Sequence, residues 1–289
     1  MGKKPWIPTR AKDWNALWQA KQIHRMSAHS AKFWNERAKS FGKKDSPGEY
    51  TEKFLELLKI LPGESVLDMG CGAGNLSIPL AQEGHHVLSA DFSTAMLDKV
   101  RERIQQNGLT DIDVMELSWE DDWKEHGIEP DSYDVCIASR SVAADDLQDA
   151  LGKLSRTAKR RCCITLATGS SPRVDDDMLK AIGIKTQPCL DDIYALAILS
   201  AKGYLPELTY IKTQRADVFP DFDAAFDKHM SMVSMTAGKK KAKKYTDKVK
   251  AWLHANLEST DLADAPDALK LKVPREVDWA FISWNKENN

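Results

Sequence analysis

The stretch that decides the fold runs Val66-Leu67-Asp68-Met69-Gly70-Cys71-Gly72-Ala73-Gly74-Asn75-Leu76. A short apolar run enters a turn that contains three glycines, and a helical pattern over residues 74–83 follows directly. Glycine has no Cβ atom, so the backbone can adopt positive φ and approach a ligand closely. A strand, a glycine turn and a helix in this order predict a ligand site at the carboxyl end of the strand, beside free N–H groups of the helix.

A second acid strengthens this prediction. Asp91 follows the next strand-like run, residues 86–90, and a carboxylate there can accept hydrogen bonds from both hydroxyls of a ribose. The glycines stand at 70, 72 and 74, and Asn75 occupies the place where the dinucleotide fingerprint G-x-G-x-x-G needs its last glycine. The pattern therefore indicates a ribose-containing cofactor and disfavours an NAD-dependent oxidoreductase.

Apolar strand-like runs and amphipathic helical runs alternate outward from this stretch. The strand-like runs are residues 65–69, 86–90, 113–117, 133–138, 162–167, 208–214 and 277–284, and helical runs include 50–61, 94–107, 145–157 and 191–202. Pro62-Gly63 is expected to end the first of these helices. The alternation predicts an α/β fold: a Rossmann-like, seven-stranded, mostly parallel sheet with helices on both faces.

Four segments are expected along the chain: a helical cap (1–48), a core (49–215), a helical insertion (216–272) before the last strand, and a final strand (273–289). We expect the cap and the insertion to cover the ligand. The alternative is that their apolar faces only pack on the sheet. The side chains behind this hypothesis are Trp6, Trp14, Trp18, Trp34, Phe219, Phe222, Phe226, Met230, Met232 and Met235.

Two linked motifs resemble a known superfamily. With Asp68, the glycine turn forms an E/D-x-G-x-G-x-G pattern that resembles motif I of the class I methyltransferases that use S-adenosylmethionine (SAM). Residues 89–97, with their D-x-S-x-x-M-L run, resemble motif II. The resemblance covers about residues 30–170. It implies SAM as cofactor, with S-adenosylhomocysteine as product.

The resemblance also implies contacts to the cofactor. Asp68 would orient the turn and the amino group of SAM, the glycines would line its methionine and ribose, and Asp91 would bind the ribose hydroxyls. The cofactor-binding set expected from sequence is Asp68, Gly70, Cys71, Gly72, Gly74, Asp91, Phe92, Met96, Trp119, Glu120 and Ser139. Within this set, Phe92 and Met96 would border the adenine.

The loop after the third strand departs from the family pattern. Ser118 stands where members commonly carry an Asp that accepts the adenine amino hydrogen. Trp119 could stack on the adenine instead, with Glu120 or Asp121 as the acceptor. An exposed acidic loop without a role in binding is the alternative.

The segment Ser139-Arg140-Ser141-Val142 resembles the R-N-V segment of quinone-biosynthesis methyltransferases, beside the transferring methyl group. The R-x-L-K-P-G-G run that follows in that branch is replaced by residues 156–161, so no close subfamily matches. Catalytic candidates are Arg140, Ser141 and Asp145, although Arg140 could also be a surface arginine. A general base is needed only if the acceptor loses a proton; candidates are His24, His29, Asp145, Asp146 and His229.

Composition narrows the class of protein. The 289 residues are 42% hydrophobic and 29% charged, with a net charge of −2 that gives no overall attraction to nucleic acid or to an anionic membrane. Five cysteines without a C-x-x-C pair predict no disulfide framework and no metal site, and suggest a reducing, cytoplasmic compartment. No apolar run approaches the ~20 residues of a membrane span.

The sequence therefore predicts a SAM-dependent methyltransferase that acts on a small molecule by in-line transfer. An RNA or protein methyltransferase is the first alternative, motivated by the lysine run 239–244, although no N-P-P-Y motif and no paired catalytic cysteines are recognisable. A SAM-binding protein without transferase activity is the second. The acceptor, the acceptor atom and the oligomeric state stay open.

Overall fold

The computed structural model describes residues 11–22, 31–38, 48–169, 172–215, 217–260 and 267–286. The chain divides into two compact units. Unit 1 comprises Met1–Leu166, Asp191–Ile211 and Ala280–Asn289, and unit 2 comprises Ala167–Leu190 and Lys212–Trp279. Unit 2 thus takes in residues 167–190, which the sequence had assigned to the core.

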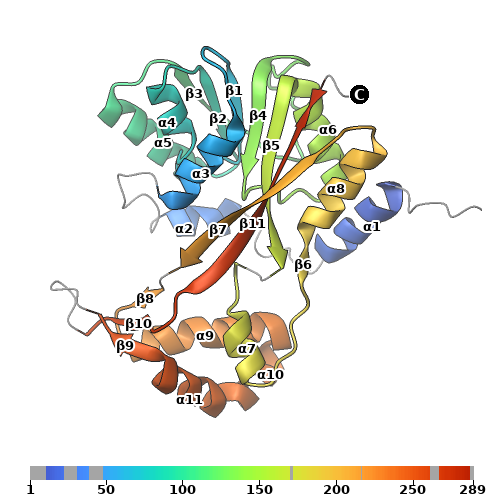
Figure 1. The fold of residues 1–289 in the computed structure, drawn as a ribbon. Helices are drawn as coiled ribbons and strands as arrows, with labels where there is room; N and C mark the ends of the chain where they lie inside the picture. The colour runs from blue at the N-terminus through green and yellow to red at the C-terminus, as the bar shows by residue number, and fades with distance from the viewer. Residues whose placement is uncertain are drawn as a thin grey trace, which may run out of the picture. The chain divides into compact units, whose positions relative to one another are not determined.

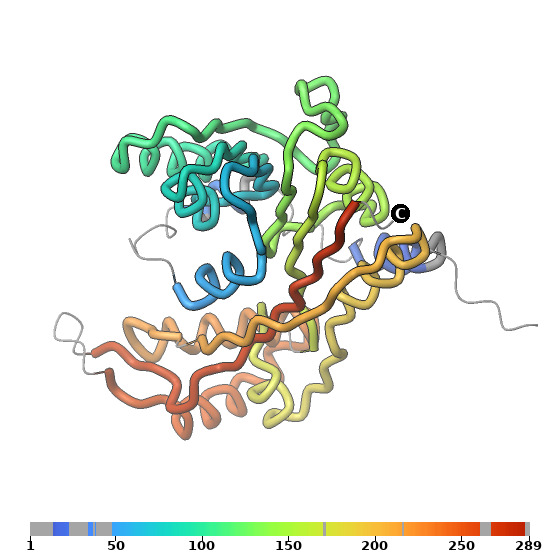
Figure 2. The backbone as a smooth tube through the Cα atoms, turned by 45° about the horizontal axis from the view of Figure 1, so that its top comes forward, coloured from blue at the N-terminus to red at the C-terminus, as the bar shows by residue number. Residues whose placement is uncertain are grey.

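The main sheet has the strand order β3-β2-β1-β4-β5-β11-β7, with β6 (Cys189–Leu190) added antiparallel to β5 (Figures 1 and 2). Neighbours among β1 to β5 run parallel, and Figure 1 shows β11 pointing the opposite way to β5 and β7. This arrangement confirms the predicted α/β fold class. The bounds are β1 Val66–Met69, β2 Val87–Asp91, β3 Ile112–Glu116, β4 Tyr133–Ser139, β5 Ala158–Gly169, β7 Glu207–Arg215 and β11 Arg275–Asn285.

The two faces of the sheet are covered by different helices. Leu67 and Met69 of β1 belong to a core cluster with residues of α1, α6 and α8. Because side chains alternate along a strand, Val66 and Asp68 face the other side, where α4 and α5 contact β2. All residues of β1 and β2 are buried, as expected for strands covered on both faces. The helices of unit 1 are α1 Ala11–Gln22, α2 Ala31–Ala38, α3 Glu49–Leu58, α4 Ser77–Gln82, α5 Thr94–Asn107, α6 Leu147–Thr157 and α8 Asp191–Ala201.

The sequence predicts both ends of α5 correctly, but it misplaces the end of α3 and the start of α4. The Ser93 side chain accepts the Met96 N–H, and Gly108 (φ 62°) ends the helix, as predicted. Helix α3 ends at Leu58, before Pro62-Gly63, because Lys59 adopts a left-handed conformation (φ 51°). Helix α4 begins at Ser77 instead of Gly74, since turns occupy residues 72–76.

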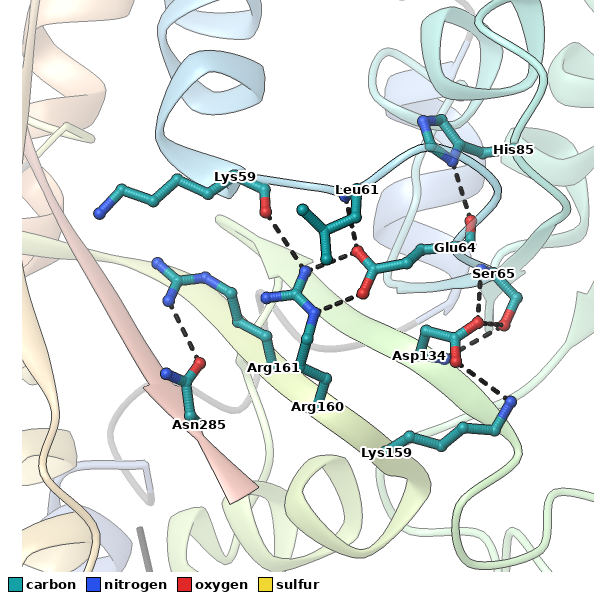
Figure 3. Close-up of polar contacts among 10 residues, drawn as sticks. All are labelled: Lys59, Leu61, Glu64, Ser65, His85, Asp134, Lys159, Arg160, Arg161 and Asn285. Atoms are coloured by element: carbon teal, nitrogen blue, oxygen red, sulfur yellow. Dashed lines mark hydrogen bonds and ion pairs between the residues drawn. The ribbon is translucent and has the colours of Figure 1, made fainter. Parts of the chain in front are cut away.

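Charged side chains join the amino ends of β1, β4 and β5 (Figure 3). Arg160 Nη2 donates to Glu64 (2.5 Å), and Glu64 also accepts the Leu61 N–H (2.7 Å). Asp134 accepts both the N–H and the hydroxyl of Ser65, at 2.8 and 2.7 Å. These bonds tie the residues that lead into β1 to the neighbouring strands β4 and β5.

Unit 2 has a core of its own. A small sheet, β8-β10-β9, and four α-helices enclose an apolar cluster that contains Phe219, Met232, Val249 and Leu253. Phe219 and Met232 are buried in this core, where they pack against other side chains of unit 2. That aromatic and methionine side chains of this segment line a ligand pocket stays a prediction. The bounds are α7 Asp176–Ala181, β8 Val218–Phe219, α9 Phe222–Ala237, α10 Lys239–Ala242, η2 Lys243–Tyr245, α11 Thr246–Asn256, β9 Leu257–Ser259 and β10 Leu269–Leu271.

None of the helices in the described ranges is long and apolar enough to cross a membrane.

Candidate functional site

The glycine turn leaves β1 in a conformation that other residues rarely adopt. Gly70, Gly72 and Gly74 have φ values of 73°, 56° and 77°. A Cβ atom on Gly70 would lie 2.3 Å from Cβ of Ser141, whereas one on Gly72 would meet no heavy atom of the described residues within 4 Å. Glycine is therefore required at 70 for packing against Ser141, and the backbone at Gly72 lies open to an incoming ligand.

Asp68 is a buried carboxyl group with one unpartnered oxygen. Its Oδ2 accepts the Ser77 hydroxyl at 2.7 Å, while Oδ1 has no hydrogen-bond partner among the described residues. Burial, with the nearby Asp91 charge as a further contribution, raises the pKa of Asp68 to about 7. A buried carboxylate without a full set of partners is costly, and a cationic ligand beside it would offset that cost.

Asp91 holds the turn and the next helix together. Its Oδ2 accepts the Gly72 N–H and its Oδ1 accepts the Ser93 N–H, both at 2.9 Å. Burial raises the pKa of Asp91, and backbone hydrogen bonds from Ser93, Gly72 and Phe92 oppose the rise. A carboxylate has about four acceptor positions, so Asp91 retains acceptor capacity for a further hydroxyl donor. Its predicted role as an acceptor for the ribose hydroxyls stays a prediction.

The N-terminal helix α2 packs on this side of the turn. Ala38 of α2 is buried together with Ala73 of the turn and Met96 of α5, and Trp34 packs against them. Asn35 Oδ1 accepts the Ser93 hydroxyl at 2.7 Å. Part of the predicted cap therefore lies next to the glycine turn. Of the other predicted residues here, Phe92 and Cys71 are half-buried, and burial raises the pKa of the Cys71 thiol.

A polar cluster stands at the carboxyl end of β4. The Tyr50 hydroxyl of α3 lies 2.7 Å from the Ser139 hydroxyl and 2.6 Å from the Thr165 hydroxyl of β5. Arg140 is an exposed residue with φ 58°; its N–H donates to Thr165 Oγ1, and its guanidinium lies 3.9 Å from the centre of the Tyr50 ring. The predicted Ser139 and Arg140 thus come together with two residues that the sequence analysis missed. In the sequence, Tyr50 stands out only as part of the apolar face of a helix.

Ser141 joins this cluster to the glycine turn. Its hydroxyl donates to the Met69 carbonyl at 2.6 Å, directly before Gly70. Trp119 Nε1 donates to the Ser141 carbonyl at 2.9 Å. The Trp119 side chain is buried beside Trp123, with ring centres 5.6 Å apart, so it packs against the interior while it positions Ser141. Its predicted stacking on adenine stays a prediction.

The acidic loop is ordered by its own side chains. The Ser118 hydroxyl donates to Glu120 Oε2 at 2.5 Å, and the Ser118 N–H donates to Asp121 at 2.7 Å. Glu120 also accepts the Asp145 N–H at 3.2 Å. Ser118, at the position where the family commonly places Asp, therefore organises two carboxylates that could accept an amino hydrogen.

The candidate bases divide between the two units. In unit 1, the Asp145 side chain is exposed, and Asp146 caps α6 by accepting the Asp149 N–H. In unit 2, His229 is buried within α9, and its Nδ1 lies 2.7 Å from the Ala225 carbonyl. Burial lowers the pKa of His229. His24 and His29 lie outside the described residues.

Comparisons with known proteins agree with the two sequence motifs. Residues 60–201 match a family model described as a methyltransferase domain. An uncharacterised protein of Haemophilus influenzae is 35% identical over 168 residues, which are 58% of this chain and 61% of that protein. The 23S rRNA (uracil(1939)-C(5))-methyltransferase RlmD of Klebsiella pneumoniae is 35% identical over 80 residues, which are 26% of this chain and 18% of that enzyme.

A solved structure supports the fold. A candidate methyltransferase from Bacillus halodurans is 14% identical to this chain, with a TM-score of 0.51, and the match covers 83% of this chain and 99% of the other. The chain spans less than two thirds of the length of its two sequence relatives above. Residues 60–201 thus match a methyltransferase domain, and the fold and the two motifs agree with the resemblance to the class I SAM-dependent superfamily.

Proposed function

We propose that this protein is a SAM-dependent methyltransferase whose methyl acceptor is a small molecule. The main support for SAM as the cofactor is that an open glycine turn lies beside Asp91. The carboxylate of Asp91 already accepts the Gly72 N–H of that turn. The unpartnered Asp68 oxygen and the open space over Gly72 fit a ligand that combines a positive charge with a ribose. When bound, SAM supplies a methyl group on a positively charged sulfur that leaves as a neutral thioether.

The residues of this chain would act by binding and orientation. Asp68 would face the positive end of the cofactor, the turn would line its middle, and Asp91 would accept its ribose hydroxyls. Trp34 and Ala38 of α2 would exclude water from the turn. Holding two reactants in line accounts for a large part of such a rate enhancement, so no general base is needed for an acceptor that has no proton to lose.

Arg140, Ser141 and Ser139 would border the acceptor. They stand at the carboxyl end of β4, next to the strand that carries Asp68, and ligands of open α/β sheets bind at the carboxyl ends of the strands. Burial raises the pKa of Tyr50, so its hydroxyl stays protonated and serves as a hydrogen-bond donor. We further propose that the insertion 216–272 covers this site. The acidic loop would accept the amino hydrogen of the adenine.

An RNA acceptor is the second candidate, because part of the chain is similar to RlmD, which is an rRNA methyltransferase. Methylation of uracil at C5 needs a thiolate that attacks the ring, and a thiolate requires an accessible cysteine of low pKa. In this chain burial raises the pKa of Cys71, Cys136, Cys162 and Cys163, and the fifth cysteine, Cys189, is buried. Methylation of uracil at C5 is therefore disfavoured. Methylation of another RNA atom, or of a protein side chain, needs no thiolate and stays an alternative.

Calorimetry with SAM, S-adenosylhomocysteine and NAD tests the cofactor. We expect micromolar-range binding of the first two only. Asp91→Ala should weaken this binding at least tenfold, whereas Asp113→Ala, which removes an exposed carboxylate from β3, should leave it unchanged. Equal affinity of the wild type and Asp91→Ala would contradict the proposal. Transfer of label from SAM to the metabolite or the RNA fraction of a cell extract then separates the acceptor classes, and no transfer to any fraction would indicate a SAM-binding protein without transferase activity.

A further inference from the structure

Residues 239–250 of unit 2 are strongly basic. Seven of the twelve residues are lysines, and Asp247 is the only acid among them. The segment carries a net charge of +6, whereas the whole chain carries −2, which leaves −8 for the remainder. This separation of charge is not explained by the proposed methyl transfer, which takes place at residues of unit 1.

The fold presents these lysines to solvent on a fixed framework. Helix α10, the turn η2 and helix α11 follow α9 in unit 2 (Figure 1). Ala242, Val249 and Leu253 are buried in the core of the unit, so they anchor one face of the segment. The opposite face is exposed and carries Lys239, Lys240, Lys241, Lys243, Lys244, Lys248 and Lys250.

The lysines gain little from the fold itself. Within the described part of the chain, no salt bridge involves any lysine between 239 and 244. Three of them occupy the first turn of α10, which holds no acid, although the helix dipole favours an acid and disfavours a cation there. Lys248 donates to the Ile182 carbonyl, and Lys250 lies over the Phe226 ring. Neither of these two lysines forms a salt bridge with a carboxylate of the described residues. Like charges held this close repel one another, and an external polyanion would relieve that repulsion.

We infer that residues 239–250 form a docking surface for the phosphate backbone of a nucleic acid strand. A helical rise of about 1.5 Å per residue gives the segment a length of about 16 Å. A strand carries one phosphate per about 3.4 Å of its axis, so this length faces about five phosphates. Ala242 and Val249 are buried, and the half-buried Tyr245 packs against the same core, so the segment offers little apolar surface to insert into a lipid. Lysine contacts to phosphate carry no sequence information, so the surface would position a nucleic acid without selecting its sequence.

The test is fluorescence anisotropy of the full-length protein with a fluorescein-labelled 20-nucleotide RNA, and with a DNA of the same sequence, between 50 and 300 mM KCl. Five phosphate contacts predict a slope of about −3.5 for the logarithm of the association constant against the logarithm of salt. The variant K239Q/K240Q/K241Q should reduce that slope by about 2 and weaken binding at 0.1 M salt by about 100-fold. The RNA and DNA arms show whether the sugar contributes.

The matched control is K124Q/K185Q/K212Q, which removes three exposed lysines elsewhere. It should change the affinity by less than about threefold, since these residues lie outside the docking surface. Equal losses in both variants, binding without salt dependence, or tighter binding to phosphatidylserine vesicles than to RNA would each overturn the inference. SAM calorimetry on the same variants should be unchanged, so a failure of the docking surface is distinguishable from a failure of the proposed methyltransferase.

Discussion

The substitution Asp68→Asn should stabilise the protein while it weakens SAM binding. Asp68 is 1% exposed, and its pKa is raised to about 7 by burial. A carboxyl group whose folded pKa lies above its unfolded value binds its proton more tightly in the folded state. The free energy of unfolding therefore falls as the pH rises from the unfolded value of 3.8 through the folded value.

The size of the effect follows from the two pKa values. With one pKa unit worth about 1.36 kcal/mol, ionisation of Asp68 costs the folded state about 4 kcal/mol once the pH is well above 7. About 3 kcal/mol of that cost develops between pH 5 and pH 8. Asn keeps the shape of Asp and can still accept the Ser77 hydroxyl, but it has no charge to bury.

The assay is urea unfolding of the ligand-free protein and the variant at pH 5 and pH 8, with Asp113→Asn as an exposed control. The advantage of Asp68→Asn over the wild type should grow by about 3 kcal/mol between the two pH values. The control should show no such growth. A variant that is less stable than the wild type at pH 8, or an advantage that is the same at both pH values, would refute the reasoning about the buried charge.

Three further predictions concern packing and ion pairs. Gly70→Ala should destabilise the protein by about 2–4 kcal/mol, because its Cβ would clash with Ser141 and its φ is positive; Ser141→Gly in the same chain should recover only the part due to the clash, as urea unfolding would show. Asp217→Asn should cost about 3–5 kcal/mol, because it leaves Lys228 and two arginines without their shared carboxylate. Burial alone would raise the pKa of Asp217, but these cations lower it. The ionised carboxylate therefore stabilises the fold above pH 3.8, and this stabilisation is lost as the pH falls through the folded pKa. Identical acid unfolding of wild type and variant, followed by circular dichroism, would contradict this. Tyr50→Phe should cost about 1–2 kcal/mol, since the buried Thr165 hydroxyl and the half-buried Ser139 hydroxyl each lose a partner. A variant that unfolds at the wild-type urea concentration would argue against the cluster.

The sequence determined the features that depend on neighbours along the chain. Alternating apolar runs predicted the strands, because the period of side-chain direction differs between strands and helices. The glycine turn and Asp91 were recognisable because a turn needs residues without Cβ atoms and because the acid directly follows its strand. The Ser93 cap and the Gly108 stop were correct for the same local reason. The start of α4 and the end of α3 were wrong, because Lys59 adopts a left-handed conformation and turns extend past Gly74, and neither feature leaves a signal in the residue types.

Only the tertiary structure decided which distant residues meet. Tyr50 reaches Thr165 because the order of the sheet places β5 beside β4, and Ser141 lies against Gly70 because β4 is the neighbour of β1. The same holds for the second unit, in which residues between 178 and 184 share a core with residues between 219 and 271. Periodicity and turn chemistry act over a few residues, whereas these contacts depend on how strands and helices pack, and packing is a property of the whole chain.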